Sequence, residues 1–272
     1  MRRFFLLNGV LALLSLTSCK KVWDYVKDHP NGYADNCKVD KIYFTEYFLD
    51  DSQVTDDGQS VYFPFKDTAN FNYNAKGQLI SIEYASFAHH LNIDMYPDIG
   101  FAFAYDSEGR LWGFFEKADI YNNRIYGWRG HKYTYVNDNL IIDSTFKGYI
   151  YAIYQGDDLR IDGDFVGVDS IFLDGWGRIV KAGSKTYSYD ASGNLIKPGV
   201  RYTSKTSIFQ TDKTLMFITR DYSVNTPVGV ATRFNSNQLP VQFNSGELAL
   251  FVTNPDRPDF EKPSPQVTYQ CK

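Results

Sequence analysis

Tyr105-Asp106-Ser107-Glu108-Gly109-Arg110-Leu111 has the form of a β-hairpin: an aromatic residue, a tight turn, and an aliphatic residue six positions later. Asp106 suits the first position of a type I turn, because its carboxylate can accept a backbone N–H. Gly109 suits the left-handed residue that closes a three-residue hairpin loop. In this register Asp106 pairs with Arg110, and Tyr105 lies opposite Leu111 on one face of the hairpin. We call this unit a cell.

Versions of the cell recur between Tyr73 and Leu239. Three more keep the spacing of six: Tyr73 to Leu79, Leu173 to Ile179, and Tyr189 to Leu195. Another three are one residue shorter and predict two-residue loops with the aromatic residue again opposite Leu: Tyr135 to Leu140, Tyr154 to Leu159, and Phe234 to Leu239. Both loop lengths therefore predict the same cross-strand pair.

The strands that lead into these turns alternate, with Phe101, Phe103 and Tyr105 on one face. A period of two with one apolar face indicates a sheet that covers a core. Aromatic residues make up 17% of the chain, and no long stretch carries the apolar period of a helix, so composition agrees. Further strands are expected at residues 201–209, 214–220, 228–234, 247–253 and 266–271. We predict an all-β domain over residues 37–272, an antiparallel meander of hairpins that forms a curved sheet, open barrel or sandwich with little helix.

Residues 1–18 have the features of an export signal: Arg2 and Arg3 precede a short apolar run from Phe4 to Leu14. Leu16-Thr17-Ser18-Cys19 is similar to the lipobox of bacterial lipoproteins, in which the Cys is diacylated and becomes the new N-terminus. The alternative is an ordinary secretory signal with an incidental Cys. A lipid on Cys19 would anchor the domain to a membrane without a transmembrane helix. Residues 19–36 then form a tether.

The charge balance argues against a nucleic-acid partner. The chain has a net charge of −4, and loss of Arg2 and Arg3 with the signal lowers it by two, to −6. Lys20-Lys21 is the one basic cluster. An acidic domain without a basic face lacks the electrostatic footprint of nucleic-acid binding.

Cys37 and Cys271 remain once Cys19 carries lipid. An exported compartment permits disulfides, which favours one bond over two buried free thiols. Such a bond requires the first and last strands of the domain to be neighbours.

The sequence carries weak signals for chemistry. Adjacent His89 and His90 would point to opposite faces of a strand, and no metal-ligand spacing is present, so no metal site is expected. The acidic run from Asp157 to Asp169 matches hairpin turns better than a Ca²⁺ loop. No nucleophile elbow, phosphate loop or dinucleotide fingerprint appears, so we expect no cofactor and no catalysis. Paired carboxylates for glycoside hydrolysis are not visible in a sequence.

Three tryptophans are candidates for ligand stacking: Trp112, Trp128 and Trp176. Trp176 falls within a hairpin loop, and Trp112 lies on the face opposite Leu111. Each can instead cap the edge of a core.

The cells at Tyr105-Asp106…Gly109-Arg110-Leu111 and Tyr189-Asp190…Gly193-Asn194-Leu195 resemble the YD repeats of Rhs-type proteins. With a lipobox, the chain is similar to small YD-repeat-like lipoproteins of Gram-negative envelopes. That resemblance covers about residues 71–239, implies an extracytoplasmic all-β scaffold and brings no catalytic residues. Surface-displayed relatives often have acidic residues after the lipidated Cys, whereas Lys20-Lys21 follow here. The periplasmic face and the outer face of the outer membrane are therefore both alternatives for the location of the domain.

Three functions follow in order of preference. The first is a lipid-anchored envelope protein with a structural or interaction role, whose partner is an envelope protein. The second is a glycan-binding lipoprotein that uses exposed aromatic residues. The third is a glycan-acting hydrolase with carboxylates across a groove.

Overall fold

A computed structural model describes residues 37–54, 60–85, 100–122, 124–155, 158–244, 247–248, 251 and 264–272. Residues 1–18, Cys19 and the tether lie outside the described residues, as do His29, His89 and His90.

Antiparallel strands make up most of the described chain, as predicted. The strands of the N-terminal half are β1 (Cys37–Val54), β2 (Ser60–Tyr73), β3 (Leu79–Tyr84), β4 (Phe101–Tyr105), β5 (Leu111–Glu116), β6 (Asp119–Tyr121), β7 (Arg124–Asn137) and β8 (Leu140–Gln155). Those of the C-terminal half are β9 (Asp158–Leu173), β10 (Ile179–Ala182), β11 (Lys185–Thr186), β12 (Tyr202–Thr206), β13 (Asn225–Pro227), β14 (Ala231–Phe234), β15 (Pro240–Phe243) and β16 (Gln266–Cys271).

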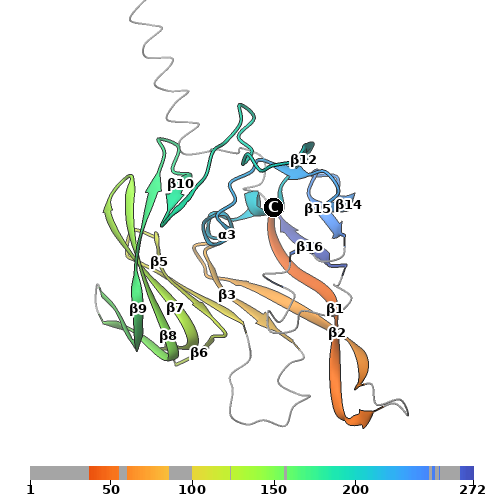
Figure 1. The fold of residues 1–272 in the computed structure, drawn as a ribbon, viewed down its shortest axis with the longest axis horizontal. Helices are drawn as coiled ribbons and strands as arrows, with labels where there is room; N and C mark the ends of the chain where they lie inside the picture. Colours follow the sequence, from red (N-terminus) through yellow and green to blue (C-terminus); the bar gives the residue numbers. More distant parts are fainter. Residues whose placement is uncertain are drawn as a thin grey trace, which may run out of the picture.

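One 14-stranded sheet contains all of these strands except β12 and β13, which pair with each other. From β1 to β11 the strands follow one another as a meander, with β6 as a side branch on β7. On the other side of β1 the order is β16, β15, β14, so the chain end returns to its beginning. Figure 1 shows that the sheet is strongly curved.

The first and last strands are neighbours, as the predicted disulfide required. Cys37 lies opposite Cys271 in the β1–β16 pair, and their sulfurs are 2.05 Å apart, which makes them a disulfide. The Asn237 amide contacts both sulfurs.

Five turns share one hydrogen-bond pattern, and four of them were predicted. In the cell at Tyr105, the Asp106 N–H donates to the Arg110 carbonyl, and the Gly109 N–H donates to the Asp106 carbonyl. Asp106 Oδ1 also accepts the Arg110 N–H at 2.8 Å. Gly109 has φ +80°, a conformation that costs glycine little. The same bonds close the turns that begin at Asn74, Asp174, Asp190 and Asn235.

Two of the three shorter cells were predicted in the wrong register. Tyr135 pairs with Ile141 rather than Leu140, and Phe234 pairs with Pro240 rather than Leu239. In the second case Gln238 takes the left-handed place of glycine, with φ 64°. Both cells therefore keep the spacing of six, while Tyr154 pairs with Leu159 as predicted.

The C-terminal third contains the other corrections. Residues 214–220, predicted as a strand, lie mostly within the helix α3 (Lys213–Thr219). Asp212 caps this helix, since its side chain accepts the Thr214 N–H at 2.7 Å. Residues 201–209 form β12 and the start of the 3₁₀ helix η1 (Ile208–Thr211). Of residues 228–234 only the last four are a strand. In the strand predicted at residues 247–253, Glu247 and Leu248 instead lie in a turn, and residues 249, 250, 252 and 253 lie outside the described residues.

The larger hydrophobic cluster fills the inside of the curved sheet. Figure 1 shows α3 inside this curve, between β10 on one side and β1 with β16 on the other. Leu215, Met216 and Phe217 of α3 are buried against the sheet. The aromatic and aliphatic residues of the cells supply most of the remaining contacts, among them Phe71, Leu79, Phe103, Leu111, Tyr133, Ile141 and Ile179. The apolar face predicted from the alternation is thus the face that α3 covers.

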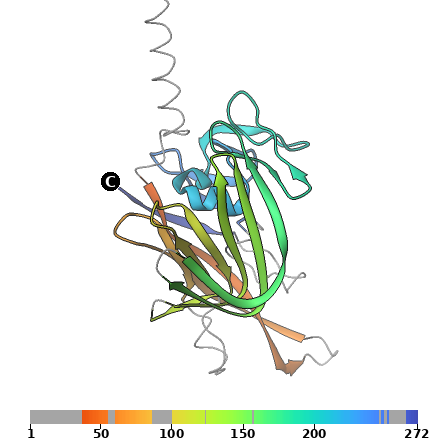
Figure 2. The same ribbon diagram turned by 90° about the vertical axis from the view of Figure 1, so that its left-hand side faces the viewer.

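A second cluster lies on the outer face of β4 and β5. The long strands β7 to β9 curve strongly (Figure 2), and Leu159, near the start of β9, packs against β5. Lys132 pairs with Asp158 at 2.7 Å. Gly113 makes room for Leu159, because a Cβ at position 113 would lie 2.7 Å from Leu159 Cδ2.

Tyrosine hydroxyls connect consecutive cells. Tyr105 donates to the carbonyl of Leu79, which closes the preceding cell, and Tyr135 donates to the carbonyl of Leu111. Three further tyrosines contact the closing residue of an earlier cell in the same way: Tyr189 to Ile179, Tyr202 to Leu195, and Tyr269 to Pro240. We call this series the tyrosine ladder.

Candidate functional site

Two cavities lie beside the short helical segment formed by η1 and α3. The first opens between the hairpin turns and α3 and has a volume of about 420 Å³; we call it the rim cavity. It is lined by Tyr105, Gly109, Arg110, Leu111, Tyr135, Ile141, Leu173, Trp176, Gly177, Lys213, Thr214, Met216, Phe217 and Tyr222. The cells that begin at Tyr105, Tyr135 and Leu173 all contribute lining residues, so the repeated hairpins form one side of the rim cavity.

Trp176 is held as a platform at the rim cavity. Its backbone N–H donates to Asp174 Oδ1 at 2.9 Å, which fixes the turn. The Arg178 guanidinium lies 4.6 Å from its ring centroid and is itself paired with Asp174. Trp176 is 38% exposed, so part of the residue reaches solvent while its ring packs on the cation. An aromatic surface held in this way is suited to stacking on a ligand ring.

The charges at the rim cavity are positive or balanced. The Arg110 guanidinium lies 4.4 Å from the Tyr135 ring centroid and pairs with Asp106 and Glu108. Its side-chain hydrogen bond to Asp106 raises the pKa of Arg110, which keeps it charged. Lys213 adds a second cation from α3. No carboxylate is among the described residues that line this cavity.

The three candidate tryptophans do not share one patch. Trp112 is half-buried and packs against the second hydrophobic cluster, on the opposite face of the sheet. Trp128 is 41% exposed and lines neither cavity. Only Trp176 therefore has the position expected of a ligand-stacking residue.

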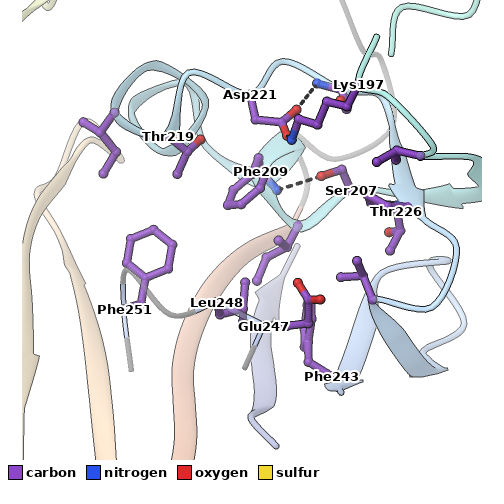
Figure 3. A pocket seen from close by; sticks show the side chains of 16 residues that line it. Lys197, Ser207, Phe209, Thr219, Asp221, Thr226, Phe243, Glu247, Leu248 and Phe251 are labelled. Atoms are coloured by element: carbon purple, nitrogen blue, oxygen red, sulfur yellow. Dashed lines mark hydrogen bonds and ion pairs between the residues drawn. The ribbon is translucent and has the colours of Figure 1, made fainter. Parts of the chain in front are cut away.

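The second cavity, on the other side of η1 and α3, has a volume of about 510 Å³; we call it the apolar cavity. Figure 3 shows Lys197 and Asp221 at one end of it and Phe243, Glu247 and Leu248 at the other. Lys197 Nζ lies 2.7 Å from Asp221 Oδ2. Most of its lining is apolar: Val200, Ile208, Phe209, Ile218, Pro227, Val230, Phe243, Leu248 and Phe251.

A charged cluster that the sequence did not reveal lies on the inner face of β7 and β8. His131 Nδ1 is 2.9 Å from Asp143 Oδ1, and Arg220 reaches the other carboxylate oxygen at 3.4 Å. His131 also stacks between Phe114 and Tyr133. The cluster ties the residue after α3 to the sheet, and it lines neither cavity.

Among the described residues, no three His, Cys, Asp or Glu side chains gather closely enough to hold a metal ion. No helix in that part of the chain is both long and apolar enough to cross a membrane. Asp158, Asp162, Asp164 and Asp169 are exposed along β9 rather than grouped.

Fold and cavities together define an all-β hairpin-repeat protein with two ligand-sized cavities beside one short helix. No model of a known protein family matches the chain, and no curated protein matches it significantly. The similarity to YD-repeat lipoproteins therefore stays a prediction from the residues of the cells.

Proposed function

We propose that the protein is a lipid-anchored binding protein of a Gram-negative envelope, held to the membrane through Cys19 and without a catalytic role. The order of signal, apolar run and Cys at residues 1–19 supports the anchor. The rim cavity, with Trp176 at its edge, supports binding as the role of the domain.

A glycan is the ligand that the position of Trp176 favours. Trp176 lines the rim cavity with its ring against Arg178 and is 38% exposed, which suits stacking against the apolar face of a sugar ring. Arg110 and Lys213 add hydrogen-bond donors at the same cavity. A hydrolase has less support, because the described lining of this cavity offers no carboxylate to act as acid or base.

Binding is tested on a glycan array with a chain that starts at Lys20. The sheet, both clusters and the disulfide lie within residues 37–272, so this chain contains the complete described fold. Trp176→Ala should weaken binding about tenfold or more, since it removes the stacking platform. Trp128→Ala is the matched control, because Trp128 is similarly exposed and lies outside the cavity. Equal binding by both variants, or no glycan bound by the wild type, would reject a glycan ligand.

The anchor is tested separately in cells that express the full chain. Wild type should incorporate labelled fatty acid and sediment with membranes, and Cys19→Ser should do neither. Labelling that survives Cys19→Ser would contradict lipidation at this position.

A further inference from the structure

The apolar cavity is independent of the rim cavity and has the dimensions of a small-molecule site. Its volume of about 510 Å³ falls in the usual range for ligand pockets, as does a mainly apolar lining with a few polar groups. Residues from four separate parts of the chain line it: Lys197 and Val200; Ser207, Ile208 and Phe209; Ile218, Thr219, Asp221, Ser223, Thr226, Pro227 and Val230; and Phe243, Glu247, Leu248 and Phe251. A cavity lined from several parts of the chain is a feature of the fold rather than a gap at one loop.

The polar groups in this lining already have partners inside the protein. Lys197 and Asp221 pair with each other, and Asp221 Oδ1 also accepts the Ser223 N–H at 2.9 Å. Thr219 and Thr226 donate their hydroxyls to the carbonyls of Leu215 and Thr206. Glu247 likewise interacts within the chain. A ligand with a net charge would have to break one of these pairs or enter without a counter-charge, and both cost free energy.

We propose that the apolar cavity binds an uncharged aliphatic molecule. The hydrocarbon chain of this ligand contacts the apolar side chains of the lining, among them Phe209 and Phe243. Burial of the chain drives binding, and the balanced Lys197–Asp221 pair at one end tolerates a neutral hydroxyl or ester group. Carboxylates and amines of the same chain length are rejected, because Lys197 and Asp221 already neutralise each other and offer no counter-charge to a charged head group.

Isothermal titration calorimetry with hexan-1-ol, octan-1-ol and decan-1-ol tests the proposal on the chain that starts at Lys20. Each added methylene should tighten binding about fourfold until the cavity is full, because each buries a further apolar group. Decanoate and decylammonium should bind at least ten times more weakly than decan-1-ol. No binding of decan-1-ol, an affinity that does not rise with chain length, or tighter binding of either charged analogue would overturn the proposal.

Val230→Phe should weaken decan-1-ol binding at least tenfold, since the larger side chain takes space in the cavity. Val228→Phe is the matched control, because Val228 is 53% exposed, lies two residues away and does not line the cavity. The affinity of this variant for decan-1-ol should equal that of the wild type. Ile218→Phe fills the cavity from α3 and serves as a second blocking variant should Val230→Phe fail to fold. Full binding by a folded blocking variant would place the ligand elsewhere.

Trp176→Ala should leave decan-1-ol binding unchanged, which separates this result from any outcome at the rim cavity.

Discussion

The tyrosine ladder predicts that a single hydroxyl carries a measurable share of stability. In Tyr135→Phe the ring stays, so the packing of the inner cluster and the contact with Arg110 are kept. What is lost is the bond from the hydroxyl to the Leu111 carbonyl, 2.9 Å away in a partly buried position. A net hydrogen bond contributes about 1 kcal/mol, and an acceptor left buried without it raises the loss to about 2 kcal/mol. We therefore expect a loss of about 1–2 kcal/mol in the free energy of unfolding.

Urea unfolding of the chain that starts at Lys20 measures this loss as a shift in midpoint at constant slope. Tyr187→Phe is the control, because Tyr187 packs against the same cluster while no described residue accepts its hydroxyl. Its loss should stay below about 0.5 kcal/mol. Tyr189→Phe removes another bond of the ladder, to the Ile179 carbonyl, and should repeat the result for Tyr135. Equal losses in Tyr135→Phe and Tyr187→Phe would refute a structural role for the ladder.

Two further predictions concern the whole domain. Burial raises the pKa of six tyrosines, namely Tyr73, Tyr133, Tyr135, Tyr189, Tyr222 and Tyr269. The folded state therefore keeps protons that the unfolded chain releases above about pH 10, so stability should fall as pH rises beyond that value, by up to about 1.4 kcal/mol per pH unit for each tyrosine. Unfolding measured from pH 8 to pH 11 checks this, and Tyr133→Phe should make the decline less steep. The Cys37–Cys271 bond spans 234 residues, and the loop-entropy model gives it about 5 kcal/mol. A double change to Ser that costs less than about 1 kcal/mol in urea unfolding would contradict that contribution.

Turns with a local chemical signature were predictable from the sequence. Asp or Asn at the first position and Gly at the fourth fix the turns at residues 74–77, 106–109, 174–177 and 190–193, because the side chain caps the loop and glycine accepts the left-handed backbone. At Phe234 the same turn forms with Gln238 in the left-handed place. Since Gln carries no such signature, the register there was predicted one residue short.

The helix and the cavities depend on contacts that the sequence does not display. The seven residues from Lys213 to Thr219 are too few to show a helical period, and their apolar content suits a strand equally well. Asp212 determines the outcome by capping the helix inside the sheet. The disulfide was predictable because two cysteines leave one possible pair. In contrast, the lining of the apolar cavity comes from segments up to 54 positions apart, between Lys197 and Phe251, so only the folded chain brings it together.

The tyrosine ladder also bears on how a chain of this kind can change in length. The cell from Tyr105 to Leu111 offers one hydroxyl to the cell before it and one carbonyl to the cell after it. A duplicate of this cell, inserted beside the original, would bring both the hydroxyl and the carbonyl, so both bonds of the ladder could form again at the new junction. Such a fold can therefore gain or lose whole hairpins by recombination while each junction stays chemically complete.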